Sequence, residues 1–171
     1  MIQLAFEAAY DPFHAAYRIL RQLVFRDGMV LPVTRAKILD VFIAEPQRCQ
    51  EIRLSNPFKK SARAAAKCQM VIYGRRPPTS LFFNRMSPMQ DAAIQTLVNR
   101  DILDVSAYKA GLLAYGRLKI EGKLLDRILL SNAEQIDLMK FLCCDLDQLP
   151  LGGANGLKDR THLGEYRYDL V

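Results

Sequence analysis

Apolar residues recur at helical spacing in several stretches of the chain, and most of these stretches open with a helix-start signal. The first begins at Asp11, a good N-cap, and Pro12, which suits the first helical position because no N–H is needed there. The apolar residues that follow predict one buried face on a helix over residues 11–26: Phe13, Ala16, Tyr17, Leu20, Leu23 and Val24. Gly28 ends this helix.

Three further helices are predicted in the next 75 or so residues. One follows Pro32 and stops before Pro46, because proline cannot continue a helix. The next covers residues 57–72 and opens with the cap signal Ser55-Asn56-Pro57. Ser87-Pro88 repeats that signal and predicts a helix up to residue 100, with these residues buried: Ala93, Ile94, Leu97 and Val98.

The segment after residue 100 predicts a short β-hairpin. Residues 102–105 favour one strand, and residues 112–115 favour its return around the turn at 109–111. A helix followed by two strands is how winged helix-turn-helix domains end, so residues 33–120 are predicted to form a winged-helix-like core. The alanine and leucine content of residues 106–114 supports a helix there equally well.

The C-terminal part divides into a helix and a tail. Asn132 is a cap candidate, and the apolar residues after it predict a helix up to residue 149: Ile136, Met139, Leu142, Cys143, Leu146 and Leu149. Residues 151–171 are first glycine-rich and then aromatic and charged, and are predicted to become ordered only on a partner or on their own domain. The predicted fold class is mainly α (α+β): one helical domain over residues 1–150 with a winged-helix-like core, a short β-hairpin, and an added C-terminal helix and tail.

Composition agrees with a single soluble domain. The chain has 171 residues, of which 50% are apolar and 25% are charged, the balance of an ordinary globular protein. No apolar run approaches the roughly 20 residues that span a bilayer, and the N-terminus has no basic region typical of a secretory signal. The four cysteines form no CxxC pair, which favours reduced thiols. We therefore expect a cytoplasmic protein with no membrane partner.

The positive charge is concentrated in one part of the chain. Residues 31–80 contain ten Lys/Arg and three Asp/Glu, a local charge of +7, whereas residues 1–30 and 81–171 carry 0 and −1. Within this region four cations fall within an arc of about 100° on the predicted helix over 57–72. We call these four residues the basic stripe: Lys59, Lys60, Arg63 and Lys67. Such a local excess indicates an anionic partner more strongly than an evenly basic surface does.

The basic stripe has three interpretations: a solvated face, a contact with the DNA backbone, or a docking site for an acidic protein. Arg75 and Arg76 add two charges in the loop that follows it. A second surface is predicted from the apolar faces of 11–26 and 132–149, which together exceed what one small domain is expected to cover, and from the aromatic tail. The predicted partner-interface residues are Phe13, Tyr17, Leu20, Met139, Leu142, Leu146, Tyr166 and Tyr168.

The sequence contains no recognisable catalytic motif. Its two histidines, His14 and His162, lie in different elements and have no cysteines at zinc-site spacing. The glycine-rich stretch 152–160 lacks the G-K-[ST] signature and the preceding strand of a phosphate-binding loop. The sequence therefore predicts neither an enzyme nor a bound metal or cofactor.

Three segments together carry a family resemblance: YDPFHAAYRILRQL, LPVTRAKILDVFIAEPQRCQEIRL and PPTSLFFNRMSPMQDAAIQTLVNRDILDV. The most telling are the aromatic first helix and the loosely spaced pattern P-x-R-A-x-x-I-L-D-x-F from Pro32 to Phe42. Over about residues 8–130 the chain resembles the middle component of bacterial ABC-three-component systems, which include the Lamassu-type defence operons against phages and plasmids. The resemblance implies an accessory subunit that joins an SMC-like, Rad50-like ABC ATPase to an effector, often a nuclease. It carries over no catalytic residue and no binding motif.

Three hypotheses for the function follow. The first is a non-catalytic adaptor of a defence complex, which touches DNA through the complex if at all. The second is a winged helix-turn-helix transcriptional regulator whose recognition helix is 88–100. This helix offers few groups for base readout beyond Asn99, Arg100 and two glutamines, and the basic residues lie elsewhere. The third is an antitoxin-like binding protein. The adaptor is the preferred hypothesis.

Overall fold

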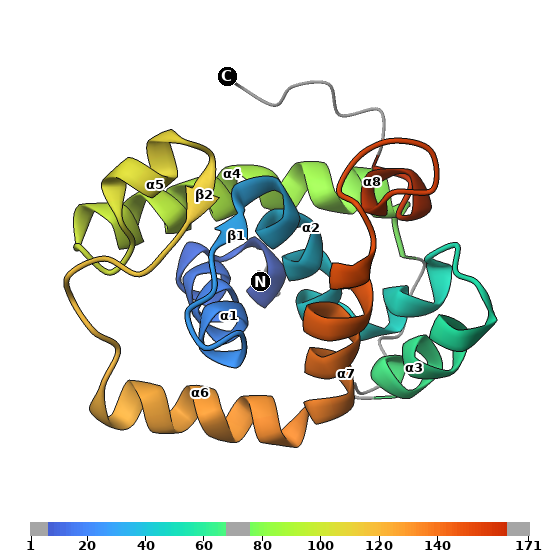
Figure 1. Ribbon diagram of the computed structural model, residues 1–171, viewed down its shortest axis with the longest axis horizontal. Helices are drawn as coiled ribbons and strands as arrows, with labels where there is room; N and C mark the ends of the chain where they lie inside the picture. The colour runs from blue at the N-terminus through green and yellow to red at the C-terminus, as the bar shows by residue number, and fades with distance from the viewer. Residues whose placement is uncertain (1–6, 68–75, 164–171) are drawn as a thin grey trace, which may run out of the picture.

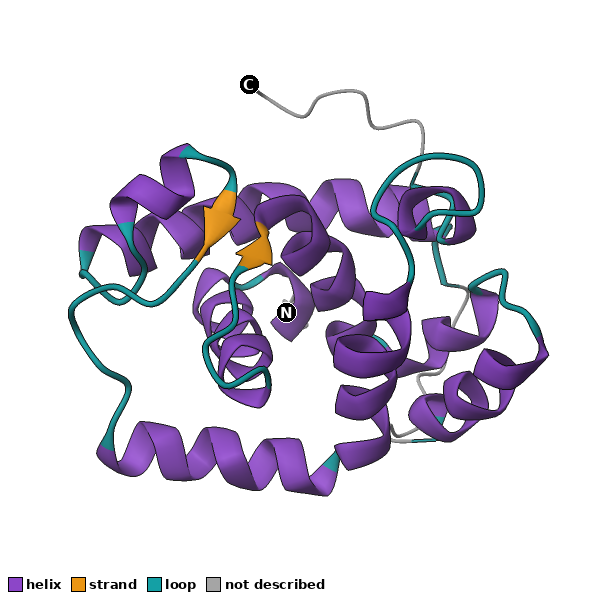
Figure 2. Cartoon of the chain, in the orientation of Figure 1, coloured by secondary structure: helices purple, strands orange, loops and turns teal. Residues whose placement is uncertain are grey.

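The architecture is mainly helical, and the described residues include one two-stranded antiparallel sheet, which pairs residues 31–32 with residues 112–113 (Figures 1 and 2). The computed structural model describes residues 7–67 and 76–163. Its elements in chain order are η1 (Ala8–Tyr10), α1 (Pro12–Phe25), β1 (Leu31–Pro32), α2 (Val33–Ala44), η2 (Pro46–Glu51), α3 (Asn56–Ala66), α4 (Thr79–Asn99), α5 (Val105–Lys109), β2 (Leu112–Leu113), α6 (Gly122–Glu134), α7 (Ile136–Lys140), the π-helical turn η3 (Phe141–Asp145), η4 (Leu146–Gln148) and α8 (Leu157–Arg160).

Helices α1, α2 and α4 pack against one another and form the centre of the fold. The N-termini of α1 and α2 lie where the sequence predicts them. Asp11 caps α1 by accepting a hydrogen bond from the His14 backbone N–H at 2.9 Å. Pro32 precedes the first residue of α2. The order α1, β1, α2, α4, β2 is consistent with the predicted winged-helix core, with residues 45–78 inserted between α2 and α4.

Helix α4 begins nine residues earlier than predicted, at Thr79 instead of residue 88. Pro77-Pro78 forms its actual boundary, with Pro78 at the N-cap. Pro88 lies inside the helix, where its missing N–H leaves the carbonyl of Asn84 without the usual helical donor. Both residues are exposed, so water can satisfy this carbonyl. The Ser87-Pro88 signal therefore does not mark a helix start.

The predicted β-hairpin is confirmed only in part. Leu103 forms an isolated antiparallel bridge with Tyr115, and the Asp104 N–H donates to the Ala114 carbonyl at 3.0 Å. Between these pairs the chain forms α5, capped by the Asp104 carboxylate, which accepts from the Ala107 N–H at 2.7 Å. β2 pairs with β1 instead of with residues 102–105. The helical alternative is correct for residues 105–109, and the strand prediction is correct for residues 112–113.

The C-terminal helix also differs from its prediction. Asn132 belongs to the last turn of α6 and is buried, so it is not a cap. Its side chain accepts from Arg21 Nε at 2.9 Å and donates to the Arg21 carbonyl at 3.1 Å, which fastens α6 to α1. Beyond Gln135 the chain continues as α7 and the η3 and η4 turns instead of one regular helix.

Two apolar clusters fill the interior, and α4 contributes to both. The larger one joins α2, the start of α4, α3, and the α7–η4 segment, and it includes Leu157 and Leu163 of the predicted tail. The smaller one joins α1, the sheet, the second half of α4, and Ile128 of α6. Residues 151–163 therefore pack on the chain's own domain.

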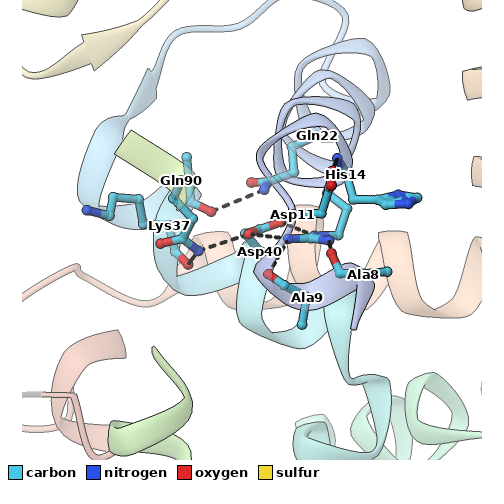
Figure 3. A network of polar contacts seen from close by, with 10 residues as sticks. Ala8, Ala9, Asp11, His14, Gln22, Lys37, Asp40 and Gln90 are labelled. Carbon is cyan, nitrogen blue, oxygen red and sulfur yellow. Dashed lines mark hydrogen bonds and ion pairs between the residues drawn. The ribbon is translucent and has the colours of Figure 1, made fainter. Parts of the chain in front are cut away.

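A buried polar network ties α1, α2 and α4 together (Figure 3). Asp40 is 0% exposed and accepts from Arg18 Nε at 2.6 Å and from Gln90 Nε2 at 2.9 Å. The Arg18 guanidinium also donates to the carbonyl oxygens of Ala8 and Ala9, so η1 is held against α1. Breaking this network would leave a charge without a partner in the interior.

The segment inserted between α2 and α4 is anchored by Arg48, which is 1% exposed. Its guanidinium pairs with Glu45 at 2.6 Å and with Glu51 at 3.6 Å. It also donates to the Pro77 carbonyl and lies over the Phe82 ring at 4.5 Å. These contacts fix the base of the insertion at the N-terminus of α4, and α3 extends from it at the edge of the molecule (Figure 1).

Candidate functional site

The basic stripe lies on the outer side of α3, as the sequence predicts from its spacing. All four side chains are exposed. The opposite side of α3 is made of small residues, and these are buried against the core: Ala62, Ala65 and Ala66. Because α3 packs on η2 and α7 through this side, its cations project away from the protein.

Within the part of the chain that the structure describes, no carboxylate forms an ion pair with the basic stripe. Glu45 and Glu51, the acidic residues nearest to it in sequence, are both bound to Arg48. Arg76 is half-buried, and Arg75 lies outside the described residues. The four charges of the stripe are therefore available to an external anion.

Other cations of the chain are occupied by the fold. Arg26 and Arg35 share the Asp147 carboxylate, with Arg26 Nη2 at 2.9 Å and Arg35 Nη1 at 3.3 Å. Burial lowers the pKa of Arg35. Burial is also the largest single influence on Arg26 and acts in the same direction, but hydrogen bonds to and charges on Asp147 and Cys143 together outweigh it, so the pKa of Arg26 is raised. Both guanidiniums stay charged and hold α1 and α2 to the C-terminal segment.

The predicted partner interface is largely internal, and this expectation is corrected. Leu20 is buried in the smaller apolar cluster, and Met139, Leu142 and Leu146 are buried in the larger one. The chain covers these faces itself, because α6 and α3 pack over them. Of the remaining predicted interface residues, Tyr166 and Tyr168 lie outside the described residues.

Phe13 and Tyr17 have different positions from those four core residues. Phe13 is 80% exposed at the start of α1. Tyr17 is half-buried, and its hydroxyl donates to the Arg127 carbonyl at 3.0 Å and lies 2.8 Å from the Ser131 hydroxyl, both on α6. Phe13 is thus the one described member of the predicted interface whose apolar side chain stays uncovered.

The structure places an exposed apolar surface on α6, which the sequence analysis did not predict. We define the α6 surface as four leucines with exposed fractions between 43% and 54%: Leu118 in the connection that precedes α6, and Leu124, Leu129 and Leu130 on α6 itself. The inner side of α6 buries only Ile128 and Asn132. Polar contacts from Tyr17 and Arg21 hold the helix in place, so its remaining apolar residues face outward. A signal was available in the run KLLDRILL, which has more leucines than one helical side can bury.

Residues 7–67 and 76–163 hold no group of three or more His, Cys, Asp or Glu that could bind a metal ion. Burial raises the pKa of the Cys143 thiol to about 12, so this cysteine is a poor nucleophile. In the described ranges, none of the helices combines the length and apolar content that crossing a membrane requires.

Comparison with protein-family models identifies the family of the chain. The family model of Middle Component 5 of ABC-three-component (ABC-3C) systems matches residues 4–169. The chain belongs to this family. A middle component is an accessory subunit that works with the other components of its ABC-3C system. The resemblance based on the three sequence segments is thereby confirmed at the level of the middle component, and the Lamassu-type assignment stays a prediction. Neither a curated protein nor a solved structure matches the chain.

Proposed function

We propose that this middle component is a non-catalytic adaptor that links the ABC ATPase of its system to an effector, and that the α6 surface is the contact with the ATPase. In the proposal the ATPase is SMC-like or Rad50-like, the effector is a nuclease, and the system is a Lamassu-type defence complex. The observation that carries the proposal is the α6 surface, four leucines on one segment that the rest of the described chain leaves uncovered.

Exposed leucines scattered singly are common on soluble proteins, whereas a contiguous exposed apolar patch is typical of an interaction site. The candidate patch consists of Leu129 and Leu130, which are adjacent in sequence and each 51% exposed, with Leu124 on the same helix and Leu118 in the connection before it. Figure 1 shows α6 along the edge of the molecule, reached by a long connection from β2. A partner can therefore cover α6 without displacing the packed interior.

The mode of attachment of α6 also supports docking. Its contacts with α1 combine the buried Ile128 with directed hydrogen bonds from the Tyr17 hydroxyl and the Arg21 guanidinium, which set the position of the helix. A helix that is fixed in this way presents its outer leucines in a preorganised arrangement. Preorganisation lowers the entropic penalty of association, so the exposed leucines are suited to binding.

Co-purification with the ATPase tests the proposal. The tagged middle component is co-expressed with the ATPase of its own operon, and the wild type is compared with a variant carrying Leu129→Ser and Leu130→Ser. A matched control carries Leu81→Ser and Val105→Ser, which are 41% and 50% exposed on α4 and α5. We expect the α6 variant to lose at least about tenfold in affinity, because central apolar contacts dominate interface energies. Equal recovery of the ATPase by the α6 variant and the control would refute the assignment of this surface.

A further inference from the structure

We infer that the basic stripe on α3 binds the phosphate backbone of duplex DNA without reading its sequence. This inference goes beyond the proposed adaptor function, because it concerns another surface on another element. Figure 1 shows α3 and α6 at different sides of the molecule, joined through α7 and the core. Contact with DNA through α3 and contact with an ATPase through α6 can therefore be tested separately.

The stripe is not explained by the stability of α3. Lys59, Arg63 and Lys67 follow one another at i, i+4 spacing, where like charges destabilise a helix by about 0.2–0.5 kcal/mol per pair. Lys59 and Lys60 also lie near the N-terminal end of α3, where the helix dipole disfavours cations. The first turn has no acidic residue, and the Ser55 side chain makes no capping hydrogen bond. Sequences that break local rules in this way do so most often at functional sites.

The stripe also differs from the arginines of the interior. Arg18, Arg26 and Arg48 each have a carboxylate partner within the chain. The cations of the stripe have none among the described residues, although they come from the region with the largest local excess of positive charge. An unpaired group of exposed cations raises the local concentration of an anionic partner.

The density of charge favours DNA over an acidic protein surface. From Lys59 to Lys67 the helix rises about 12 Å, and a duplex carries about seven phosphate charges over that length of its axis. The phosphates over that length therefore outnumber the four cations of the stripe. The stripe consists of lysine and arginine, and exposed Asn56 lies on the same side of α3, three and four residues before Lys59 and Lys60, so four cations accompany a single amide there. Contact with the backbone is thus the chemistry that these residues suit.

Helix α4, the recognition helix of the regulator hypothesis, has a weaker claim to DNA. Its exposed cations are Arg85 and, at the C-cap, Arg100. Between them lies Asp91, which is 57% exposed and pairs with Lys37 at 2.7 Å. This carboxylate would face the phosphates in a groove-bound arrangement. A measurement of DNA binding with charge-reversal variants distinguishes α3 from α4.

The test measures binding of the full-length chain to a fluorescein-labelled 30-base-pair duplex of arbitrary sequence, by anisotropy, between 50 and 200 mM NaCl. Four phosphate contacts predict a slope of about −3.6 for log K against log[salt], which is a loss of about 150-fold across this range. The stripe variant carries Lys59→Glu, Lys60→Glu, Arg63→Glu and Lys67→Glu. The matched control carries four charge reversals at other exposed positions: Arg85→Glu, Arg100→Glu, Lys109→Glu and Lys119→Glu.

We expect the stripe variant to lose DNA binding at 50 mM NaCl while the control keeps the wild-type slope, although both variants have the same net charge. A variant with glutamine at the four stripe positions, checked by circular dichroism and thermal unfolding, separates loss of charge from loss of fold. Binding by the stripe variant, or loss of binding in the control alone, would overturn the inference, the latter in favour of the cations of α4 and of the segment that follows it. Absence of DNA binding by the wild type, together with loss of ATPase recovery in the stripe variant, would overturn it in favour of an acidic protein partner. Because this assay uses the chain alone, its failure leaves the α6 result untouched.

Discussion

Two regions of the molecule use the same residue types in opposite ways. One is the interior region where α1, α2 and α4 meet, called the joint below, and the other consists of the outer sides of α3 and α6. In the joint, Arg18 is paired with Asp40 and the leucines of the smaller apolar cluster are packed on all sides. On α3 and α6, lysine, arginine and leucine side chains project outward without a partner among the described residues. The contrast shows that residue type and helical spacing alone do not reveal which face stabilises the fold and which is left for a partner.

The largest expected effect comes from removing the carboxylate at the centre of the joint. Asp40→Ala leaves the Arg18 guanidinium charged and buried, and we expect it to lower the free energy of unfolding by about 3–5 kcal/mol in urea titrations. Asp91→Ala is the matched control, since it breaks the ion pair with Lys37 at a carboxylate that is 57% exposed. This control is expected to lose about 0–1 kcal/mol. Similar losses in the two variants would contradict the distinction between interior and outer charges.

The next largest effect compares two leucines. Leu142 was predicted to meet a partner and is instead fully buried, so Leu142→Ala is expected to lower the free energy of unfolding by about 2–5 kcal/mol. Leu130 on α6 is half exposed, and Leu130→Ala is expected to change it by less than about 0.5 kcal/mol. The measurement is again equilibrium unfolding of the isolated chain. A small loss for Leu142→Ala would restore that residue as a candidate for a partner interface.

Features of the fold that depend on local sequence could be predicted. The starts of α1, α2 and α3 follow from a cap residue or a proline beside the first turn, and the outward direction of the basic stripe follows from its spacing. These features depend on neighbours within four or five residues, which a single sequence displays directly.

Errors arose where a residue's role is set by distant parts of the chain. Asn132 has the chemistry of a cap, but its partner is Arg21, more than 100 residues earlier, and this contact places it inside α6. Leu20 and Leu142 have the periodicity of an apolar face, which is the same whether the chain or a partner covers it. The anchoring of the insertion by Arg48 depends on Pro77 and Phe82. None of these pairings can be deduced from spacing alone.

The smallest effect tests whether the basic stripe opposes the stability of its own helix. Arg63→Gln removes the like-charge pairs with Lys59 and Lys67 and keeps a residue of similar helix propensity, so we expect the free energy of unfolding to rise by about 0.4–1 kcal/mol in low salt. The gain should shrink in 1 M NaCl, where exposed charges are screened. Arg85→Gln is the control on α4, because the residues three and four positions from Arg85 are uncharged, and it should leave stability unchanged. If Arg63→Gln instead lowers the free energy of unfolding by more than this control does, Arg63 contributes to the fold. The distinction between inner cations that stabilise the fold and outer cations that do not would then fail for α3.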